Sequence, residues 1–257
     1  MTYPTCRDPQ HLVGLSEPEE HWLSTEDGHE IRVWYYPSKN GAAILSLGGL
    51  TGSLGAQLPA VKGLVKEGYG VLQIDSRACL DPSTPVTLGA NEIYDAATGI
   101  EFLLAREEVD HEKIGVIGFS MGGATAIRAA ARHPEIRAVI RDGGFSNLGV
   151  LLDGSDQYSS VPMRIFRKAI ILIYQIQTDI DPWTVNPIGD LSKISPRPVL
   201  LIFGQYESEY GIEQFAAAGE GKMIWIVPGG RHGQNHLVAP EEYDQQILNF
   251  FDQTFGN

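Results

Sequence analysis

Six short runs of aliphatic and β-branched residues, spread along the chain, constrain the fold more than any other feature. Each run has the length of one buried strand. They are AAILSL (42–47), GVLQID (70–75), KIGVIGF (113–119), AVIRD (138–142), PVLLIFG (198–204) and MIWIV (223–227). Helical spacing of apolar residues follows most of them, at 58–67, 90–106, 124–133 and 241–255. This alternation predicts an α/β fold with a mainly parallel sheet and helices on both faces.

The N-terminal region has a different pattern. In HWLSTEDGHEIRVWYYP (21–37), the turn signal EDG separates two alternating runs. This arrangement predicts a β-hairpin added at one edge of the sheet. In such sheets, ligands bind at the carboxyl ends of the strands. The candidate functional residues are therefore sought directly after the predicted strands.

Composition excludes several classes of protein. The chain has 257 residues, of which 43% are hydrophobic and 20% charged, as expected of one globular domain spanning 1–257. Its formal net charge of -13 would repel a nucleic-acid backbone. Two cysteines, Cys6 and Cys79, imply no disulfide framework, and the N-terminus lacks the pattern of a secretory signal. The most apolar segment, 169–176, is too short for a membrane-spanning helix. We expect a soluble, cytoplasmic protein that does not bind nucleic acid.

The segment GFSMGG (118–123) joins a predicted strand to a predicted helix. Its GxSxG pattern, in this context, is typical of a nucleophile elbow, in which Ser120 projects from a strained turn. Gly118 and Gly122 fit this reading because the tight turn leaves no space for side chains there. The alternative is a serine that only caps the following helix.

A nucleophilic serine needs a histidine base oriented by a carboxylate. Three histidines follow Ser120: His133, His232 and His236. His133 ends the helix after the elbow, whereas His232 lies in a glycine-rich loop after the last strand, which favours it over His236. Spacing of four between His232 and His236 is compatible with a metal pair on a helix, but the loop glycines disfavour a helix there. We predict no metal site.

The acid is expected after the strand at 198–204, where the sequence reads QYESEYG. Glu207 is our choice, because a short turn after the strand would direct it toward the histidine. Glu209 and Asp142, at the end of the preceding strand, are the alternatives. An oxyanion hole requires two backbone amides, which we assign to Met121 and to Leu50 in the loop GGLTGS (48–53).

Over nearly its whole length the chain resembles the α/β-hydrolase superfamily, and within it the serine-aminopeptidase-like and dienelactone-hydrolase-related esterase branch. The resemblance rests on GFSMGG, RPVLLIFGQYE and VPGGRH. Two positions depart from the family pattern. Gly48-Gly49 stands where the family commonly has histidine and glycine, and Glu207 where aspartate is usual.

Residues 143–197, between two predicted strands, form a stretch too long for a structureless loop. We expect a cap or lid at approximately 148–192, with a helix at 162–177. Apolar side chains in it could line an acyl pocket or simply pack on the core. The candidate substrate-binding residues are Met163, Phe166, Ile170, Tyr174 and Trp183.

These features predict a serine hydrolase, specifically a carboxylesterase that cleaves small-molecule esters of small to medium apolar acyl groups through an acyl-serine intermediate. No cofactor is expected, and a homo-oligomer is compatible with the sequence. Alternatives on the same residues are an amidase or peptidase, a thioesterase, a lactone hydrolase and a perhydrolase. A different class, a non-catalytic protein of this fold that binds a small ligand, also remains open.

Overall fold

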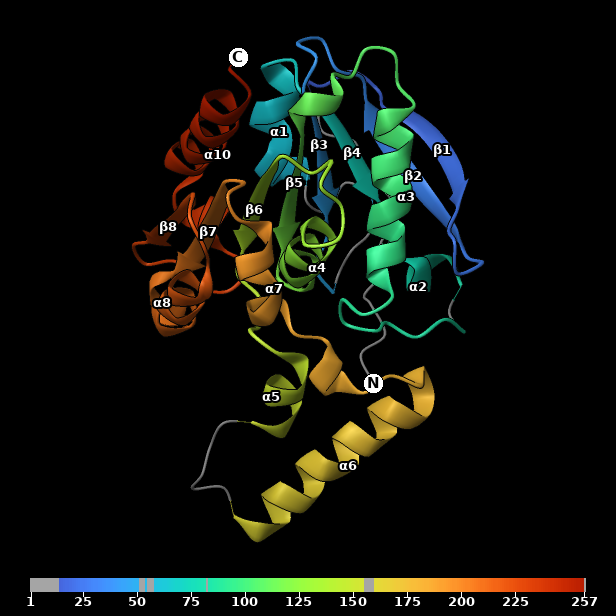
Figure 1. Ribbon diagram of the computed structural model, residues 1–257, viewed down its shortest axis with the longest axis vertical. Helices are drawn as coiled ribbons and strands as arrows, with labels where there is room; N and C mark the ends of the chain where they lie inside the picture. Colours follow the sequence, from blue (N-terminus) through green and yellow to red (C-terminus); the bar gives the residue numbers. More distant parts are fainter. Residues whose placement is uncertain (1–13, 51–53, 55–57, 82, 155–159, 257) are drawn as a thin grey trace.

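A computed structural model describes residues 14–50, 54, 58–81, 83–154 and 160–256. Its eight strands form one sheet in the order β1-β2-β4-β3-β5-β6-β7-β8 (Figure 1). The strands are β1 (Glu19–Ser24), β2 (Glu30–Tyr36), β3 (Ala43–Leu47), β4 (Gly70–Ile74), β5 (Ile114–Phe119), β6 (Ala138–Asp142), β7 (Val199–Gly204) and β8 (Lys222–Val227). The helices are α1 (Leu58–Lys66), α2 (Arg77–Leu80), α3 (Glu92–Leu104), α4 (Met121–Ala130), α5 (Leu148–Asp153), α6 (Val161–Thr178), α7 (Pro187–Ile194), α8 (Ser208–Ala217), α9 (Asn235–Val238) and α10 (Pro240–Phe255).

Strand pairing confirms the predicted mainly parallel sheet. β3 to β8 pair with one another in parallel, whereas β2 pairs antiparallel with both β1 and β4. The predicted hairpin is therefore β1 and β2 at the sheet edge. All six predicted strands are present, with ends that differ by at most one residue. β3 to β7 are buried along their whole length, and their sequences are accordingly mostly apolar.

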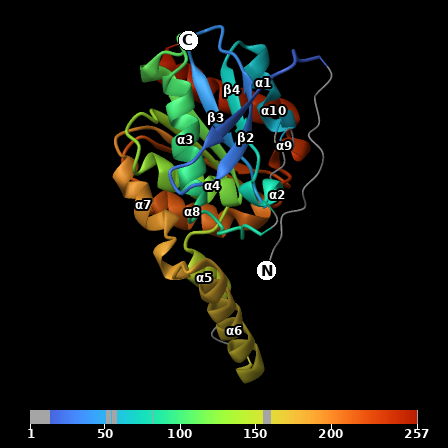
Figure 2. The ribbon, with the colours of Figure 1, turned by 90° about the vertical axis from the view of Figure 1, so that its right-hand side faces the viewer.

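Helices cover both faces of the sheet and create two apolar cores. One core packs residues of α3, α4 and α7 against the sheet, including Ile100, Ile127 and Leu191. The second packs α1 and α10 on the opposite face, with Val61 and Phe250 among its buried residues. Figure 1 shows α3 and α4 in front of the strands, and Figure 2 shows α10 on the opposite side of the sheet from α3. The sheet thus packs between two layers of helices, and the loops at its carboxyl edge can position side chains.

Between β6 and β7 the chain extends outside the sheet and the helices that cover it, which together we call the body. Helices α5 and α6, which we call the arm, extend away from the sheet, and α7 returns to pack against α4 (Figures 1 and 2). A single turn of 3-10 helix, Pro182–Thr184, connects the arm to α7. The arm and its return occupy the region where the sequence predicts a cap.

In the described part of the chain, no helix is both long enough and apolar enough to cross a membrane. Five further helices of the described chain, α2, α5, α7, α8 and α9, lie outside the helical segments that the sequence pattern indicated. α2 and α9 have four residues each, which is too short for a helical repeat of apolar positions to be recognised.

Candidate active site

Ser120 stands at the turn between β5 and α4 in a backbone conformation that few residues adopt. Its φ is 56° and its ψ is -114°, a strained region that is typical of functional positions. A side chain at Gly118 would place its Cβ 2.1 Å from the Gly122 oxygen, and one at Gly122 would lie 2.3 Å from the Leu47 oxygen. Both glycines are therefore required for the close approach of strand, turn and helix that exposes the Ser120 hydroxyl.

His232 reaches this hydroxyl from the loop after β8. The distance between Ser120 Oγ and His232 Nε2 is 2.8 Å. The loop packs closely on the end of β7. A Cβ on Gly204 would lie only 2.4 Å from the Gly230 carbonyl carbon, so the contact needs glycine at this position. Residues far apart in the sequence are thus brought into hydrogen-bonding distance at the carboxyl edge of the sheet.

Glu207 completes a chain of hydrogen bonds. It lies in the 3-10 turn Gln205–Glu207 directly after β7, and its Oε1 is 2.7 Å from His232 Nδ1. When Nδ1 donates to this carboxylate, Nε2 is free to accept the Ser120 hydroxyl proton. The hydrogen bond that His232 donates to Glu207 raises the pKa of His232, and burial opposes this effect. The three residues have the arrangement that general-base activation of a serine requires.

The alternative candidates lie in other environments. Glu209 is exposed in the first turn of α8. His133 lies just beyond the end of α4. His236 packs edge-on against the Tyr243 ring, with a centroid separation of 6.0 Å, and burial lowers its pKa. None of these residues makes the contacts with Ser120 that His232 makes.

Asp142, the third candidate acid, has a different position. It is fully buried at the end of β6, where Asn235 Nδ2 and Tyr243 OH donate to its two carboxylate oxygens at 2.6 and 2.9 Å. Burial raises its pKa to about 6. Its backbone oxygen accepts from the Ser120 amide at 2.8 Å. Asp142 therefore ties together the serine turn, the helix that follows the histidine loop, and α10.

Sequence reasoning did not identify Asn235 or Tyr243. Asn235 begins α9 three residues after His232 and is 1% exposed, and Tyr243 is fully buried in α10. A buried asparagine without a partner would be costly, but the sequence does not show that Asn235 is buried. Only the contact with Asp142, distant in the chain, gives it a role.

The loop after β3 approaches the serine as an oxyanion hole requires. A Cβ on Gly49 would lie 3.4 Å from both Ser120 Cβ and the Phe119 oxygen. Leu50 packs against a small apolar cluster that contains Met121. Both residues assigned to the oxyanion hole thus adjoin the serine turn. The rest of the predicted loop, 51–53, lies outside the described residues.

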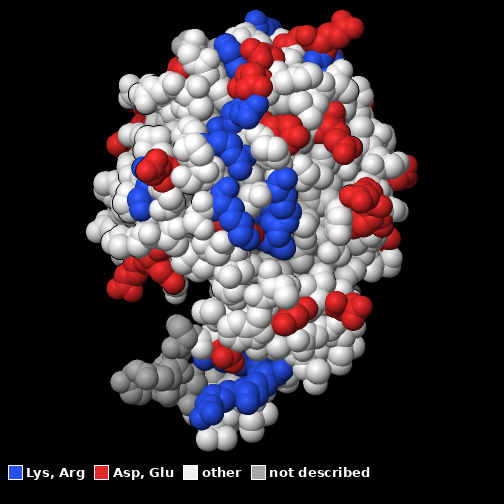
Figure 3. All heavy atoms as spheres, in the orientation of Figure 1, with Lys and Arg blue, Asp and Glu red and all other residues white. Residues whose placement is uncertain are grey.

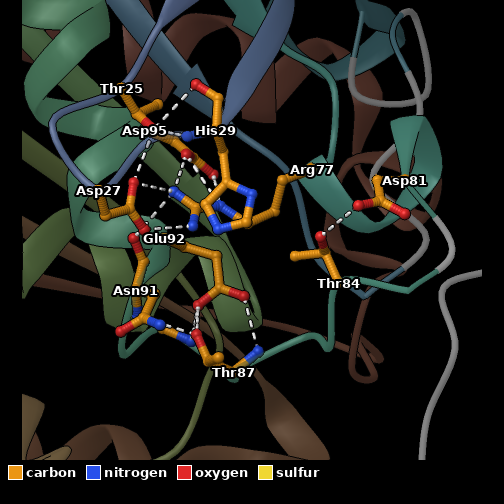
Figure 4. Close-up of polar contacts among 11 residues, drawn as sticks. Thr25, Asp27, His29, Arg77, Asp81, Thr84, Thr87, Asn91, Glu92 and Asp95 are labelled. Carbon is orange, nitrogen blue, oxygen red and sulfur yellow. Dashed lines mark hydrogen bonds and ion pairs between the residues drawn. The ribbon is translucent and has the colours of Figure 1, made fainter. Parts of the chain in front are cut away.

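A buried ion-pair cluster lies near this loop, across a small cavity. The Arg77 side chain is 2% exposed and pairs with both Asp27 and Asp95, and Glu92 accepts hydrogen bonds from the Thr87 amide and hydroxyl (Figure 4). Glu92 and Asp95 border a small cavity that Gly48, Gly49 and Met121 also line. The cluster fixes the beginning of α3 next to the candidate oxyanion hole.

A cavity of about 580 Å³ opens beside Ser120 and His232. Its wall combines the segment after β6 with side chains of α5, α7 and α8. Other residues lining it are Gly144, Phe145, Ser146, Asn147, Val150, Leu151, Gly154, Ile188, Glu207, Tyr210 and Glu213. The segment GGFSN (143–147), directly after β6, supplies much of this wall.

The five predicted substrate-binding residues do not appear among those described residues that line this cavity. Met163 and Phe166 are exposed on α6, and Ile170 is half-buried there. Tyr174 is buried and donates to the Thr87 oxygen at 2.7 Å. Trp183 packs on Gly149 and borders a different cavity. The physical reason is that α6 extends outward along its length and does not fold back over Ser120.

Cys79, in α2, takes part in a disulfide bond. The sequence, in which two cysteines imply no disulfide framework, did not predict this bond, and Cys79 is not a free thiol. Cys6 lies outside the described residues. Among the residues that the structure describes, no group of three or more histidine, cysteine, aspartate and glutamate side chains is arranged to hold a metal ion.

Comparison with known families agrees with this geometry. A family model described as "alpha/beta hydrolase fold" matches residues 42–207, more than half of the chain. The chain belongs to this family. The match begins next to β3 and ends at Glu207, and so includes the glycine-rich loop, the serine turn and the candidate acid.

Individual relatives match different shares of the chain. An uncharacterized protein of Mycobacterium tuberculosis is 26% identical over 240 residues, covering 90% of this chain and 78% of that protein. Cutinase 2 of Thermobifida cellulosilytica is 28% identical over 117 residues, or 44% of each chain. The structure of a Pyrococcus furiosus esterase superposes with a TM-score of 0.71 at 24% identity, covering 96% of this chain and 99% of that one. This last similarity shows the fold.

Proposed function

We propose that this member of the α/β-hydrolase family is a serine carboxylesterase. The observation that carries the proposal is the hydrogen-bond chain from Ser120 through His232 to Glu207, with distances of 2.8 and 2.7 Å. A serine that only capped α4 would need neither the strained backbone nor a histidine at its hydroxyl. The ester chemistry is supported by the cutinase similarity over part of the chain.

In the proposed reaction, Ser120 Oγ attacks the ester carbonyl carbon while its proton passes to His232 Nε2. Glu207 remains ionised and stabilises the imidazolium that forms. The amides of Leu50 and Met121 donate to the oxyanion of the tetrahedral intermediate. Its collapse breaks the bond to the leaving alcohol, which takes the proton from Nε2. Water then attacks the acyl-serine, again through His232, and releases the carboxylic acid and the free Ser120 hydroxyl.

The cavity beside Ser120 favours esters with a neutral acyl group of small to medium size. Val150, Leu151 and Ile188 line it and can remove methylene groups from water. Glu213 also lines it, and its Oε2 accepts from Ser146 Oγ at 2.9 Å. A carboxylate at this position would repel a charged carboxylate on the substrate. The five residues predicted on and near α6 are not required for this pocket.

The same carboxylate supports a second candidate, an amidase or peptidase. Glu213 could pair with the free amino group of an aminoacyl substrate, which a neutral ester lacks. Amides need a well-placed proton for their poorer leaving group. His232 Nε2 could supply it.

The chain is treated in this proposal as a single domain, with residues 148–192 inserted between β6 and β7 as a cap. Within that insertion, α5 and α7 contribute to the cavity wall. The arm helix α6 does not, among the described lining residues. The functional part of the proposed cap is therefore its base, close to the sheet.

Labelling with a fluorophosphonate probe tests the activated serine directly. The wild-type protein should become labelled at Ser120, whereas Ser120→Ala and heat-denatured protein should not. A folded, unlabelled wild-type protein would favour the non-catalytic alternative. A panel of p-nitrophenyl esters, compared with aminoacyl p-nitroanilides, then separates esterase from peptidase. Faster turnover of the anilides, lost on Glu213→Gln, would favour the peptidase.

A further inference from the structure

Helix α6 exposes a continuous apolar stripe on its outward side. Val161, Ile165, Leu172 and Ile176 are separated by four, seven and four residues, and Ala169 lies between them. These positions share one side of an α-helix. The four larger side chains are 56–74% exposed. We call these five residues the α6 stripe.

The opposite side of α6 is the one that the fold covers. Tyr174, two residues from both Leu172 and Ile176, lies about half a helical turn away. It is 6% exposed and packs with Leu148, Val185 and Ala90. The helix is therefore anchored by one face, and the α6 stripe on the other is left without a partner within the described chain. Contiguous exposed apolar surface of this kind marks an interaction site.

The charge of α6 is opposite in sign to the net charge of the whole chain. The helix carries Arg164, Arg167 and Lys168 and no acidic residue, although the whole chain has a formal net charge of -13. Figure 3 shows lysine and arginine atoms gathered at the outer end of the arm. Arg164 and Lys168, four residues apart, lie along one border of the α6 stripe. A positively charged border beside an apolar face complements an anionic lipid surface.

We propose that α6 docks the protein on anionic phospholipid surfaces, lying parallel to the membrane. The α6 stripe enters the boundary between headgroups and acyl chains, and Arg164 and Lys168 pair with lipid phosphates. The arm's projection from the body (Figure 2) allows α6 to approach a surface while the acidic body stays away from it. A second copy of the chain fits less well, because pairing two α6 helices would bring together six basic side chains without an acidic one on either helix.

Docking would also orient the candidate active site. Val150 and Leu151 of α5 are exposed and line the cavity beside Ser120, and α5 packs against α6. A docked α6 therefore holds the cavity close to a phase in which neutral esters dissolve. This orientation rests on the proposed function, whereas lipid docking does not.

Vesicle flotation with Ser120→Ala protein tests docking without lipid hydrolysis. Vesicles of phosphatidylcholine alone are compared with vesicles of equal parts phosphatidylcholine and phosphatidylglycerol. The variant Ile165→Ser/Leu172→Ser/Ile176→Ser removes apolar surface, and Arg164→Gln/Lys168→Gln removes charge. Ile212→Ser, an equally exposed isoleucine on α8, is the matched control. Circular dichroism verifies that each variant is folded.

The parent protein should bind the anionic vesicles and be released by high salt. Partitioning should fall at least tenfold in the apolar triple variant, and the preference for anionic vesicles should disappear in the charge variant. Ile212→Ser should bind like the parent. No vesicle binding by the parent, or equal binding by the triple variant, would overturn the proposal. If the parent protein does not bind vesicles but is a dimer in light scattering, and the triple variant is a monomer, the α6 stripe binds a second copy of the chain. The triple substitution is also made in the protein that retains Ser120, and hydrolysis of a water-soluble ester is measured. Unchanged hydrolysis shows that the triple variant has lost docking and not the proposed function.

Discussion

The carboxyl edge of the sheet and the arm use apolar residues in opposite ways. Around the sheet, Ile117 and Ile140 are fully buried, and the neighbouring loops are held closely enough to align Ser120, His232 and Glu207. On the arm, Ile165 and Ile176 are mostly exposed. The difference teaches that an apolar residue near the site can serve packing in one place and association in another. Only the burial of each side chain distinguishes these roles.

The largest expected effect is the loss of activity when residues at the carboxyl edge of the sheet are replaced. Ser120→Ala should lower kcat for ester hydrolysis by at least ~10³, because the nucleophile is lost while the fold remains. His232→Ala should have a similar effect, whereas His236→Ala should be mild. Steady-state kinetics with p-nitrophenyl esters, together with thermal melting, checks both statements. Normal turnover in Ser120→Ala would remove the basis of the proposed mechanism.

A stability measurement sharpens the same comparison. Ile140→Ala, in the buried strand β6, should lower the free energy of unfolding by about 2–5 kcal/mol, because it leaves a cavity in a packed core. Ile176→Ala, on the exposed side of α6, should change it by about 0.5 kcal/mol or less. Urea denaturation of both variants provides the values. A large loss from Ile176→Ala would show that α6 is packed against the body in solution.

Replacing the acid should be next in size. Glu207→Gln should reduce kcat/KM about 10²-fold or more, because the imidazolium loses its counter-charge. Since Glu207 raises the pKa of His232, and the base must be neutral, the rise of kcat/KM with pH should move to lower pH in this variant. A pH series of initial rates measures both effects. Glu209→Gln is the control, and a larger loss in Asp142→Asn than in Glu207→Gln would assign the acid to β6.

The smallest expected effect concerns acyl length. Shortening Val150 or Ile188 to alanine enlarges the cavity, so the preferred acyl chain should become longer, with changes of a few-fold per methylene. Phe166→Ala and Trp183→Ala should leave the profile as it is, because neither is among the lining residues described. Initial rates on esters of graded acyl length show which pair of substitutions, at Val150 and Ile188 or at Phe166 and Trp183, changes the preferred length. If only Phe166→Ala altered the dependence of rate on acyl length, the acyl pocket would be assigned to α6.

The sequence predicts what depends on local pattern. The buried strands were recognisable as continuous apolar runs, and Ser120 by glycines that the tight turn makes necessary. Glu207 and His232 followed from their positions after β7 and β8, and in the structure His232 contacts both Ser120 and Glu207. Their catalytic roles remain predictions.

What the sequence could not reveal depends on long-range placement. An apolar helical repeat was clear at 162–177, but it does not distinguish a helix that covers a pocket from one that projects. The acyl pocket was therefore assigned to α6, whereas the described cavity is lined mostly by GGFSN, α5 and α8. Asn235 and Tyr243 became meaningful only when both were found to contact Asp142.

The bonds of Asp142 to Asn235 and Tyr243 have a consequence for the order in which the protein is made. The ribosome releases Ser120 long before it releases the histidine loop and α10. At a translation rate of about 5–20 residues per second, the delay is on the order of ten seconds. During that time the nascent chain carries a serine with neither its base nor the anchor that positions the base. Under the proposed function, Ser120 would therefore gain its activating histidine only after the last helix of the chain reaches β6.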